Sequence, residues 1–185
     1  MQAQGDPVKP APIFLMIIPA LLFFVSPSYA EKGTVTLRAT QENSSVSGQA
    51  DLEDTPAGLK ITAKVLHASP GSHAIHIHEF PDCGDSGKAA GSHFNPEGAP
   101  HGFFAKDGPA QAHIGDLGNI EIFPDGTGNL EVVLPGVGLK DGKYAVAGRS
   151  LVLHEKVDDF SQPAGNAGSR IGCGEIILNP AQAGQ

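Results

Sequence analysis

The chain has no excess of positive charge and no internal repeat. Its 12 Lys and Arg residues face 20 Asp and Glu residues, so the formal net charge is −8 at neutral pH. A protein that binds nucleic acid or an anionic membrane surface through electrostatics needs the opposite balance, so the charge argues against both partners. The 185 residues are within the range of a single domain with extra segments.

No hydrophobic run is long enough to span a bilayer comfortably. Residues 13–25 read "IFLMIIPALLFFV", thirteen residues where a membrane helix needs about twenty. A polar segment precedes this run, and small residues follow it at Ser28 and Ala30. This order predicts a secretory signal peptide over 1–30, cleaved before Glu31, and a domain over 31–185. An uncleaved membrane anchor is the alternative.

Cysteine is scarce, with only Cys83 and Cys173 in the chain. In an exported protein two cysteines most simply form one disulfide, whereas two free buried thiols would fit a cytosolic protein better. Export to the periplasm or the extracellular space is therefore expected, and the signal does not distinguish the two.

A helical period with caps is missing from the mature chain. Short alternating segments separated by Gly, Pro, Asn and Asp run through it instead. They lie at 34–40, 45–52, 58–68, 73–80, 118–134 (a hairpin), 144–155 and 172–178. The pattern predicts an all-β sandwich or barrel of about eight strands. Two long segments interrupt it, 81–116 and 155–171, and each follows a strand that carries histidine. Long loops of this kind are uncommon in compact domains unless they are functional.

Residues 73–80 read "HAIHIHEF" and place three histidines within six residues. Because side chains alternate along a strand, His76 and His78 share one face, and Ile75 and Ile77 share the other. Two imidazoles on one face can bind one metal ion, although a half-polar strand with solvated histidines is an equal alternative. His73 has the parity of the isoleucines and is interpreted as a core histidine.

The first long segment adds His93, His101 and His113, followed by Asp116, and His154 ends the strand before the second. Three imidazoles with one carboxylate make a four-coordinate site suited to Zn²⁺. His76, His78 and His154 remain as an all-nitrogen cluster, which suits copper. Surface histidines on a flexible loop are the alternative, but they explain neither the clustering nor Asp116.

Five segments together resemble the copper/zinc superoxide dismutases. They are "HAIHIHEF", "GSHFNP" (91–96), "AHIGDLGN" (112–119), "LVLHEKVDD" (151–159) and "GNAGSRIGCG" (165–174). The resemblance implies an eight-stranded, flattened Greek-key barrel with two long functional loops. It implies an oxidoreductase that disproportionates superoxide to dioxygen and hydrogen peroxide, with copper and zinc as cofactors and superoxide as the small-molecule substrate.

The resemblance also implies roles for individual residues. Copper would be bound by His76, His78, His93 and His154, and zinc by His93, His101, His113 and Asp116. His93 would be shared, as six histidines and one aspartate must supply two four-ligand sites. Cys83 and Cys173 would form the family's disulfide, Asp158 would link a copper histidine to a zinc histidine, and Arg170 would guide the anion beside copper. An ordinary surface salt bridge is the alternative for Arg170.

Three features depart from the family pattern. The loop "FSQPA" (160–164) is short and has few charges, Ala164 stands where a threonine is usual, and "PHGFF" (100–104) differs around His101. Long-range attraction of the substrate is therefore expected to be weak. A copper carrier without catalysis and a secreted adhesion domain are the competing functions. The protein is expected to bind no nucleic acid and, after signal cleavage, no membrane; a homodimer is a further expectation.

Overall fold

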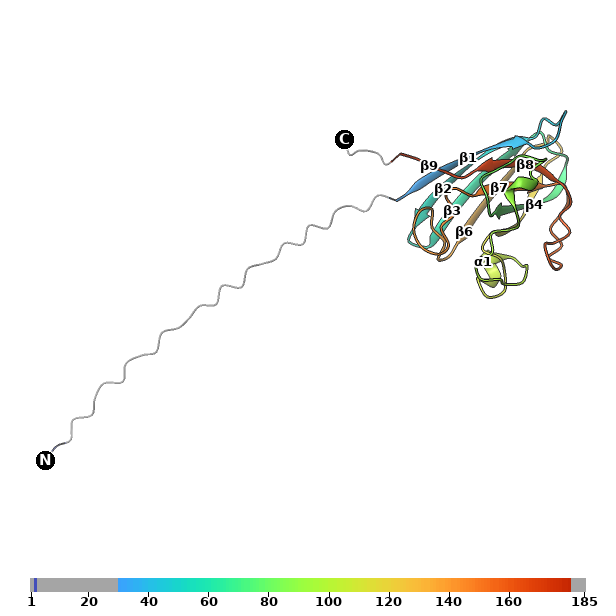
Figure 1. Cartoon of the computed structure of the whole chain (residues 1–185). Coiled ribbons are helices and arrows are strands. Elements are labelled where there is room, and N and C mark those ends of the chain that lie inside the picture. Colours follow the sequence, from blue (N-terminus) through green and yellow to red (C-terminus); the bar gives the residue numbers. More distant parts are fainter. Residues whose placement is uncertain (1, 3–29, 181–185) are drawn as a thin grey trace.

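Nine β-strands form the framework of the chain in the computed structural model, which describes residue 2 and residues 30–180 (Figure 1). They are β1 (Lys32–Ala39), β2 (Ser47–Thr55), β3 (Gly58–Leu66), β4 (Gly71–His78), β5 (Asp116–Ile122), β6 (Gly128–Leu134), β7 (Ser150–His154), β8 (Arg170–Glu175) and β9 (Ile177–Leu178). Two short helical turns, η1 (Lys88–Ala90) and α1 (Phe104–Asp107), interrupt the loop between β4 and β5. The predicted signal segment, except Ala30 and residue 2, lies outside the described residues.

The strands form one closed antiparallel sheet. Their order is β2-β3-β6-β5-β4-β7-β8-β1-β9, and β2 also pairs with β1 and closes the barrel. Because only Ile176 separates β8 from β9 and both pair with β1, they act as one interrupted strand. The neighbours β7-β4-β5-β6 have the Greek-key order. The predicted all-β, eight-stranded barrel is therefore confirmed.

Alternation along the strands builds the core. In β1 the buried positions are Gly33, Val35 and Leu37, and exposed residues separate them. The same period in β3 buries Leu59, Ile61, Ala63 and Val65. Because each strand presents one apolar face to the barrel interior, the polar residues between them face outward.

The predicted strand over 144–155 is wrong in its first half, since β7 begins only at Ser150. Gly148 has a positive φ of 73°, which breaks the extended backbone. The side chain of Arg149 then folds back and donates from Nε to the carbonyl of Ala145 at 3.0 Å. The apolar residues of this stretch line the core from a turn, and not from a strand.

Two long connections leave the barrel, 79–115 after β4 and 155–169 after β7. Figure 1 shows the first of them, with α1, projecting beside the strands. The prediction that each follows a histidine-bearing strand is confirmed, because β4 ends at His78 and β7 at His154. Within the described residues no helix has the length and apolar character needed to cross a membrane.

Candidate metal centre

Strands β4 and β7 pair side by side and carry the first three histidines. His76 is opposite Val152 and His78 is opposite Ser150 in this ladder, with His154 at its end. Ile75 and Ile77 enter the core, as the alternation predicts. His76 and His78 are not solvated, however: their exposed fractions are 0% and 1%. The two long connections cover this face of the barrel.

A short extended segment from the first connection adds His93 to these strands. The backbone N–H of Phe94 donates to the carbonyl of Ile77 at 2.9 Å, and His93 forms an isolated bridge with His78. This pairing brings the ring of His93 to 4.1 Å from that of His76 and 4.9 Å from that of His78, centroid to centroid. A segment expected to be loop is thus held in register by the strand beside it.

The four histidines of the first group converge. His76, His78, His93 and His154 each offer a ring nitrogen, and these nitrogens all lie within 4.8 Å of one another. The Nε2 atoms of His78 and His154 are 3.2 Å apart. Burial lowers the pKa of His78 and of His154 to about 2. Neutral imidazoles keep a lone pair on one nitrogen, which is what a metal ion requires.

The second group shares His93 and adds Asp116. Its members are His93, His101, His113 and Asp116, again with donor atoms within 4.8 Å. His93 Nδ1 is 2.8 Å from Asp116 Oδ1 and 3.3 Å from His113 Nδ1. Ligands bonded at 2.0–2.1 Å in a tetrahedron stand about 3.3 Å apart. The spacing and the donor set therefore fit a structural zinc ion.

Asp158 connects the two groups. His76 Nε2 donates to Asp158 Oδ2 at 2.8 Å, and His101 Nε2 donates to Asp158 Oδ1 at 2.8 Å. The Nδ1 atom of His76 is buried and has no hydrogen-bond partner among the described residues, whereas His101 Nδ1 lies 2.8 Å from Asp116 Oδ2. An unpartnered buried polar atom is costly. His76 belongs to the first group, where a metal ion would satisfy its Nδ1 atom, and His101 and Asp116 are both members of the second group.

The charges around Asp158 favour an ionised carboxylate. Burial alone would raise the pKa of Asp158, but hydrogen bonds from His101 and His76 outweigh it and hold that pKa well below its usual range. Burial likewise opposes the charge on His101, yet the carboxylates of Asp116 and Asp158 raise its pKa to about 9. For His93 burial dominates over Asp116 and lowers the pKa to about 4.

The backbone around Asp158 is fixed by neighbours that sequence reasoning missed. The side-chain amide of Asn119 donates to the carbonyl of Asp158 at 3.0 Å and accepts from its N–H at 2.7 Å. The N–H of Phe160 donates to Asp158 Oδ1 at 2.8 Å. Gly165 packs so closely that an added Cβ would lie 1.9 Å from the same oxygen. Asn119 and Gly165 lie inside the resembling segments, which was their only signal in the sequence, and Phe160 lies in the departing loop 160–164.

Arg170 lies in the wall of a cavity of about 830 Å³ above the first group. His78, His93 and His154 line the same cavity, together with Ala164. The guanidinium donates from Nη1 to the carbonyl of Gly87 and from Nη2 to that of Gly91, each at 2.6 Å. No carboxylate forms a salt bridge with Arg170 among the residues described, so the salt-bridge alternative is wrong.

The connection that holds Arg170 is itself fixed by the disulfide between Cys83 and Cys173, with Cα atoms 5.7 Å apart. The bond joins the first connection to β8 across 90 residues of sequence. The disulfide expected from the sequence is thus present. It holds the segment with Gly87 and Gly91 beside β8, the strand that begins at Arg170.

His73 is a buried histidine outside both groups, as its strand parity predicts. Its Nδ1 donates to the carbonyl of His154 at 2.8 Å, and its Nε2 is 2.9 Å from the carbonyl of Ser69. The ring therefore ties β4 to the end of β7 and offers no free nitrogen to a metal.

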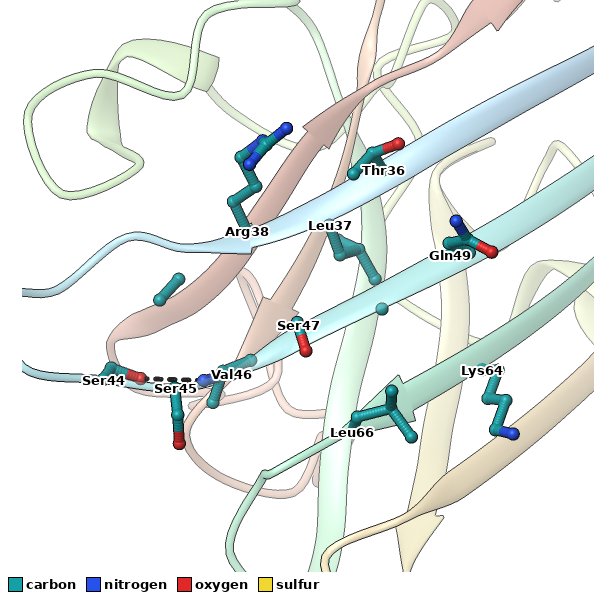
Figure 2. A pocket seen from close by; sticks show the side chains of 12 residues that line it. Thr36, Leu37, Arg38, Ser44, Ser45, Val46, Ser47, Gln49, Lys64 and Leu66 are labelled. Carbon is teal, nitrogen blue, oxygen red and sulfur yellow. Dashed lines mark hydrogen bonds between the residues drawn. The ribbon is translucent and has the colours of Figure 1, made fainter.

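A second hollow, of about 620 Å³, lies on the outer face of β1, β2 and β3. Figure 2 shows Arg38, Gln49 and Lys64 on its neighbouring strands. Its lining contains hydroxyl groups, an amide, two cations and leucines, with no histidine, cysteine or carboxylate. The hollow therefore lacks the ligands that zinc and copper prefer.

Comparison with known proteins agrees with this geometry. The family model "Copper/zinc superoxide dismutase (SODC)" matches residues 31–176. An extracellular superoxide dismutase [Cu-Zn] of Caenorhabditis elegans is 40% identical over 136 residues, which are 70% of this chain and 60% of the relative. Superoxide dismutase [Cu-Zn] 2 of Aquifex aeolicus is 35% identical over 167 residues, 86% of this chain and 96% of the relative. Among solved structures, the clock protein EA4 superposes with a TM-score of 0.71 at 29% identity, over 82% of this chain and 97% of that one.

Proposed function

The chain belongs to the copper/zinc superoxide dismutase family, and from that premise we propose which of its residues hold each metal and what each contributes to superoxide disproportionation. We assign copper to His76, His78, His93 and His154, and zinc to His93, His101, His113 and Asp116. The observation that carries the assignment is the pair of converging groups that share His93 alone.

The family reaction converts two superoxide anions and two protons into dioxygen and hydrogen peroxide, with bound copper supplying the one-electron chemistry that zinc lacks. The chain supplies ligand geometry. Asp158 accepts hydrogen bonds from the Nε2–H of His76 and of His101 and so fixes the orientation of both rings toward their metal groups. His93 uses both ring nitrogens, Nδ1 toward Asp116 and His113 and the other toward the copper group.

Arg170 is proposed as the residue that attracts and orients superoxide. A guanidinium stays charged at neutral pH and offers several N–H donors to a small anion. The two backbone carbonyls that bind Nη1 and Nη2 fix its position without neutralising its charge. Its place in the cavity wall with three of the histidines supports this role.

Replacement of His93 by Ala tests the assignment. Because one ring would serve both metals, His93→Ala should abolish most superoxide consumption and reduce both copper and zinc content, measured by elemental analysis and visible absorption. His67→Asn is the matched control: His67 is exposed and has a positive φ of 59°, which Asn tolerates. Full copper and zinc with an unchanged spectrum in His93→Ala would contradict the shared ligand. Stoichiometric copper without turnover in the wild type would instead identify a carrier.

Export is supported by the disulfide, a bond typical of oxidising compartments, and by the relatives named as extracellular. We propose that residues 1–30 are a signal peptide removed after Ala30, which delivers the mature chain to the periplasm or the extracellular space. N-terminal sequencing of protein from the native host should begin at Glu31. A membrane-bound chain that still begins at Met1 would contradict this.

A homodimer of this chain remains a prediction. Sedimentation of the mature protein measures it directly, and a single species at the monomer mass across the accessible concentration range would contradict it.

A further inference from the structure

The two long connections are joined at one point by an amide side chain. Gln162 Nε2 donates to the carbonyl of His101 at 2.8 Å, and the N–H of His101 donates to Gln162 Oε1 at 2.9 Å. Neither main-chain group of His101 takes part in a backbone–backbone hydrogen bond within residues 30–180. Among the described residues, both main-chain hydrogen bonds of His101 are therefore made by the amide of Gln162.

The side chain of His101 contacts a carboxylate on each side. Its Nδ1 is 2.8 Å from Asp116 Oδ2, and its Nε2 is 2.8 Å from Asp158 Oδ1. The ring is buried between two carboxylates, so a small rotation or shift of its backbone would break one contact or the other. Gln162 fixes the backbone from which this ring extends.

The same residue also orders the cavity wall. Pro163 and Ala164 follow Gln162 directly and line the cavity that contains the copper group. The loop is short and closes with a hydrogen bond from the N–H of Gly165 to the carbonyl of Ser161 at 2.8 Å. The hydrogen bonds between Gln162 and His101 thus join this loop, which lines the cavity of the copper group, directly to a residue of the zinc group.

We propose that Gln162 is a positioning residue for zinc: its amide holds His101 in the orientation that binds the ion and couples zinc binding to the shape of the cavity wall. The inference rests on the proposed assignment of His101 as a zinc ligand. Partners that orient metal ligands typically change metal affinity by about 10–100-fold when removed. Loss of this amide should therefore weaken zinc binding by about tenfold and leave copper binding unchanged.

Gln162→Met removes both hydrogen bonds and keeps the length of the side chain, and Gln162→Ala removes the side chain as well. Gln49→Met is the matched control, because Gln49 is exposed on β2 and lines the second hollow, whose lining contains no histidine (Figure 2). Zinc release from the purified holoenzyme to a chromophoric chelator gives the affinity. Co²⁺ placed in the zinc site reports the ligand geometry through its visible absorption, which a general loss of loop stability would not change in the fully loaded protein.

We expect about tenfold weaker zinc binding and an altered Co²⁺ spectrum in Gln162→Met and in Gln162→Ala, with copper content and the Gln49→Met variant as in the wild type. Wild-type zinc release and Co²⁺ spectrum in Gln162→Met would overturn the proposal, even if Gln162→Ala were defective, because packing and not the amide would then be responsible. A wild-type protein that binds no zinc would overturn the metal assignment itself, which separates the two failures.

Discussion

Gly165 occupies a position where any side chain would collide with the carboxylate of Asp158. A Cβ there would lie 1.9 Å from Asp158 Oδ1 and 2.7 Å from His101 Nε2, and the backbone has a positive φ of 71°. Glycine is therefore required for two reasons: the backbone has a positive φ, and there is no room for a Cβ atom beside Asp158. The close approach lets the backbone of the short loop close over the residue that links the two metal groups.

The two requirements can be separated with a matched pair of variants. Gly165→Ala should lower the Tm of the metal-free protein and weaken the binding of both metals, because Asp158 must move away from His76 and His101. Gly136→Ala is the control: its φ is 74°, but nothing lies within 4 Å of the added Cβ. It bears only the conformational cost, about 1–2 kcal/mol. Scanning calorimetry and metal titration measure both; equal effects of the two variants would contradict a collision at Asp158.

At the residue level, the sequence predicted the candidate metal ligands better than the residues that hold them in place. The histidines and Asp116 carry chemistry in their side chains, and their type and grouping pointed to metal binding before any coordinates. Asn119 and Gln162 act through amide contacts with the backbone of a residue far away in sequence. Such contacts have no period and no characteristic spacing, so no pattern in the chain indicates them.

Among the elements, the strands with strict alternation were predictable, and those without it were not. β1 and β3 alternate cleanly, and their predicted bounds differ from the observed ones by about two residues. All the residues of β7 are buried because the barrel covers one face and the long connections cover the other. Apolar residues also precede Gly148 and Arg149, so the sequence was interpreted as one strand, although these two residues mark the turn before Ser150.

The disulfide gives the first connection a role beyond stability. It fixes the segment whose carbonyls at Gly87 and Gly91 hold the guanidinium of Arg170. A loop of about 90 residues contributes about 4–5 kcal/mol to stability through the reduced entropy of the unfolded chain. Loss of the bond should consequently affect both the stability of the barrel and the position of Arg170.

Replacement of both Cys83 and Cys173 by Ala tests this dual role. The Tm should fall by about 10 °C or more, since each kcal/mol shifts the Tm of a domain of this size by about 2–4 °C. The kcat/KM for superoxide should fall as well, and Arg170→Ala in the cysteine-free background should cost less than in the wild type. Fully additive losses in kcat/KM would show that the disulfide does not act through Arg170. Metal content, measured in every variant, controls for loss of the site.

For the whole molecule, charge works against the substrate. The chain carries a formal charge of −8, and superoxide is an anion, so the overall field repels it. The cavity contains one cation, Arg170, and one carboxylate, Glu79, in its lining. Lys106 and Lys156 lie on the two long connections, but neither lines the cavity. Attraction must therefore act at short range, close to the histidines.

This arrangement predicts a shallow dependence of the rate on salt. Two unit charges a few ångströms apart attract by about 1 kcal/mol in water, and several times more where solvent is partly excluded. Because 1.4 kcal/mol is about tenfold in rate, Arg170→Ala should lower kcat/KM about tenfold with both metals retained, and Arg170→Glu should lower it further. A single cation in the cavity acts mostly within one Debye length, about 8–10 Å at moderate ionic strength, so salt has little distance over which to screen it. Initial rates of superoxide consumption from low to physiological salt should consequently fall only slightly for the wild type and less still for Arg170→Ala. An equally steep fall in both proteins would assign the attraction to residues outside the cavity, and Lys106→Ala and Lys156→Ala would then identify them.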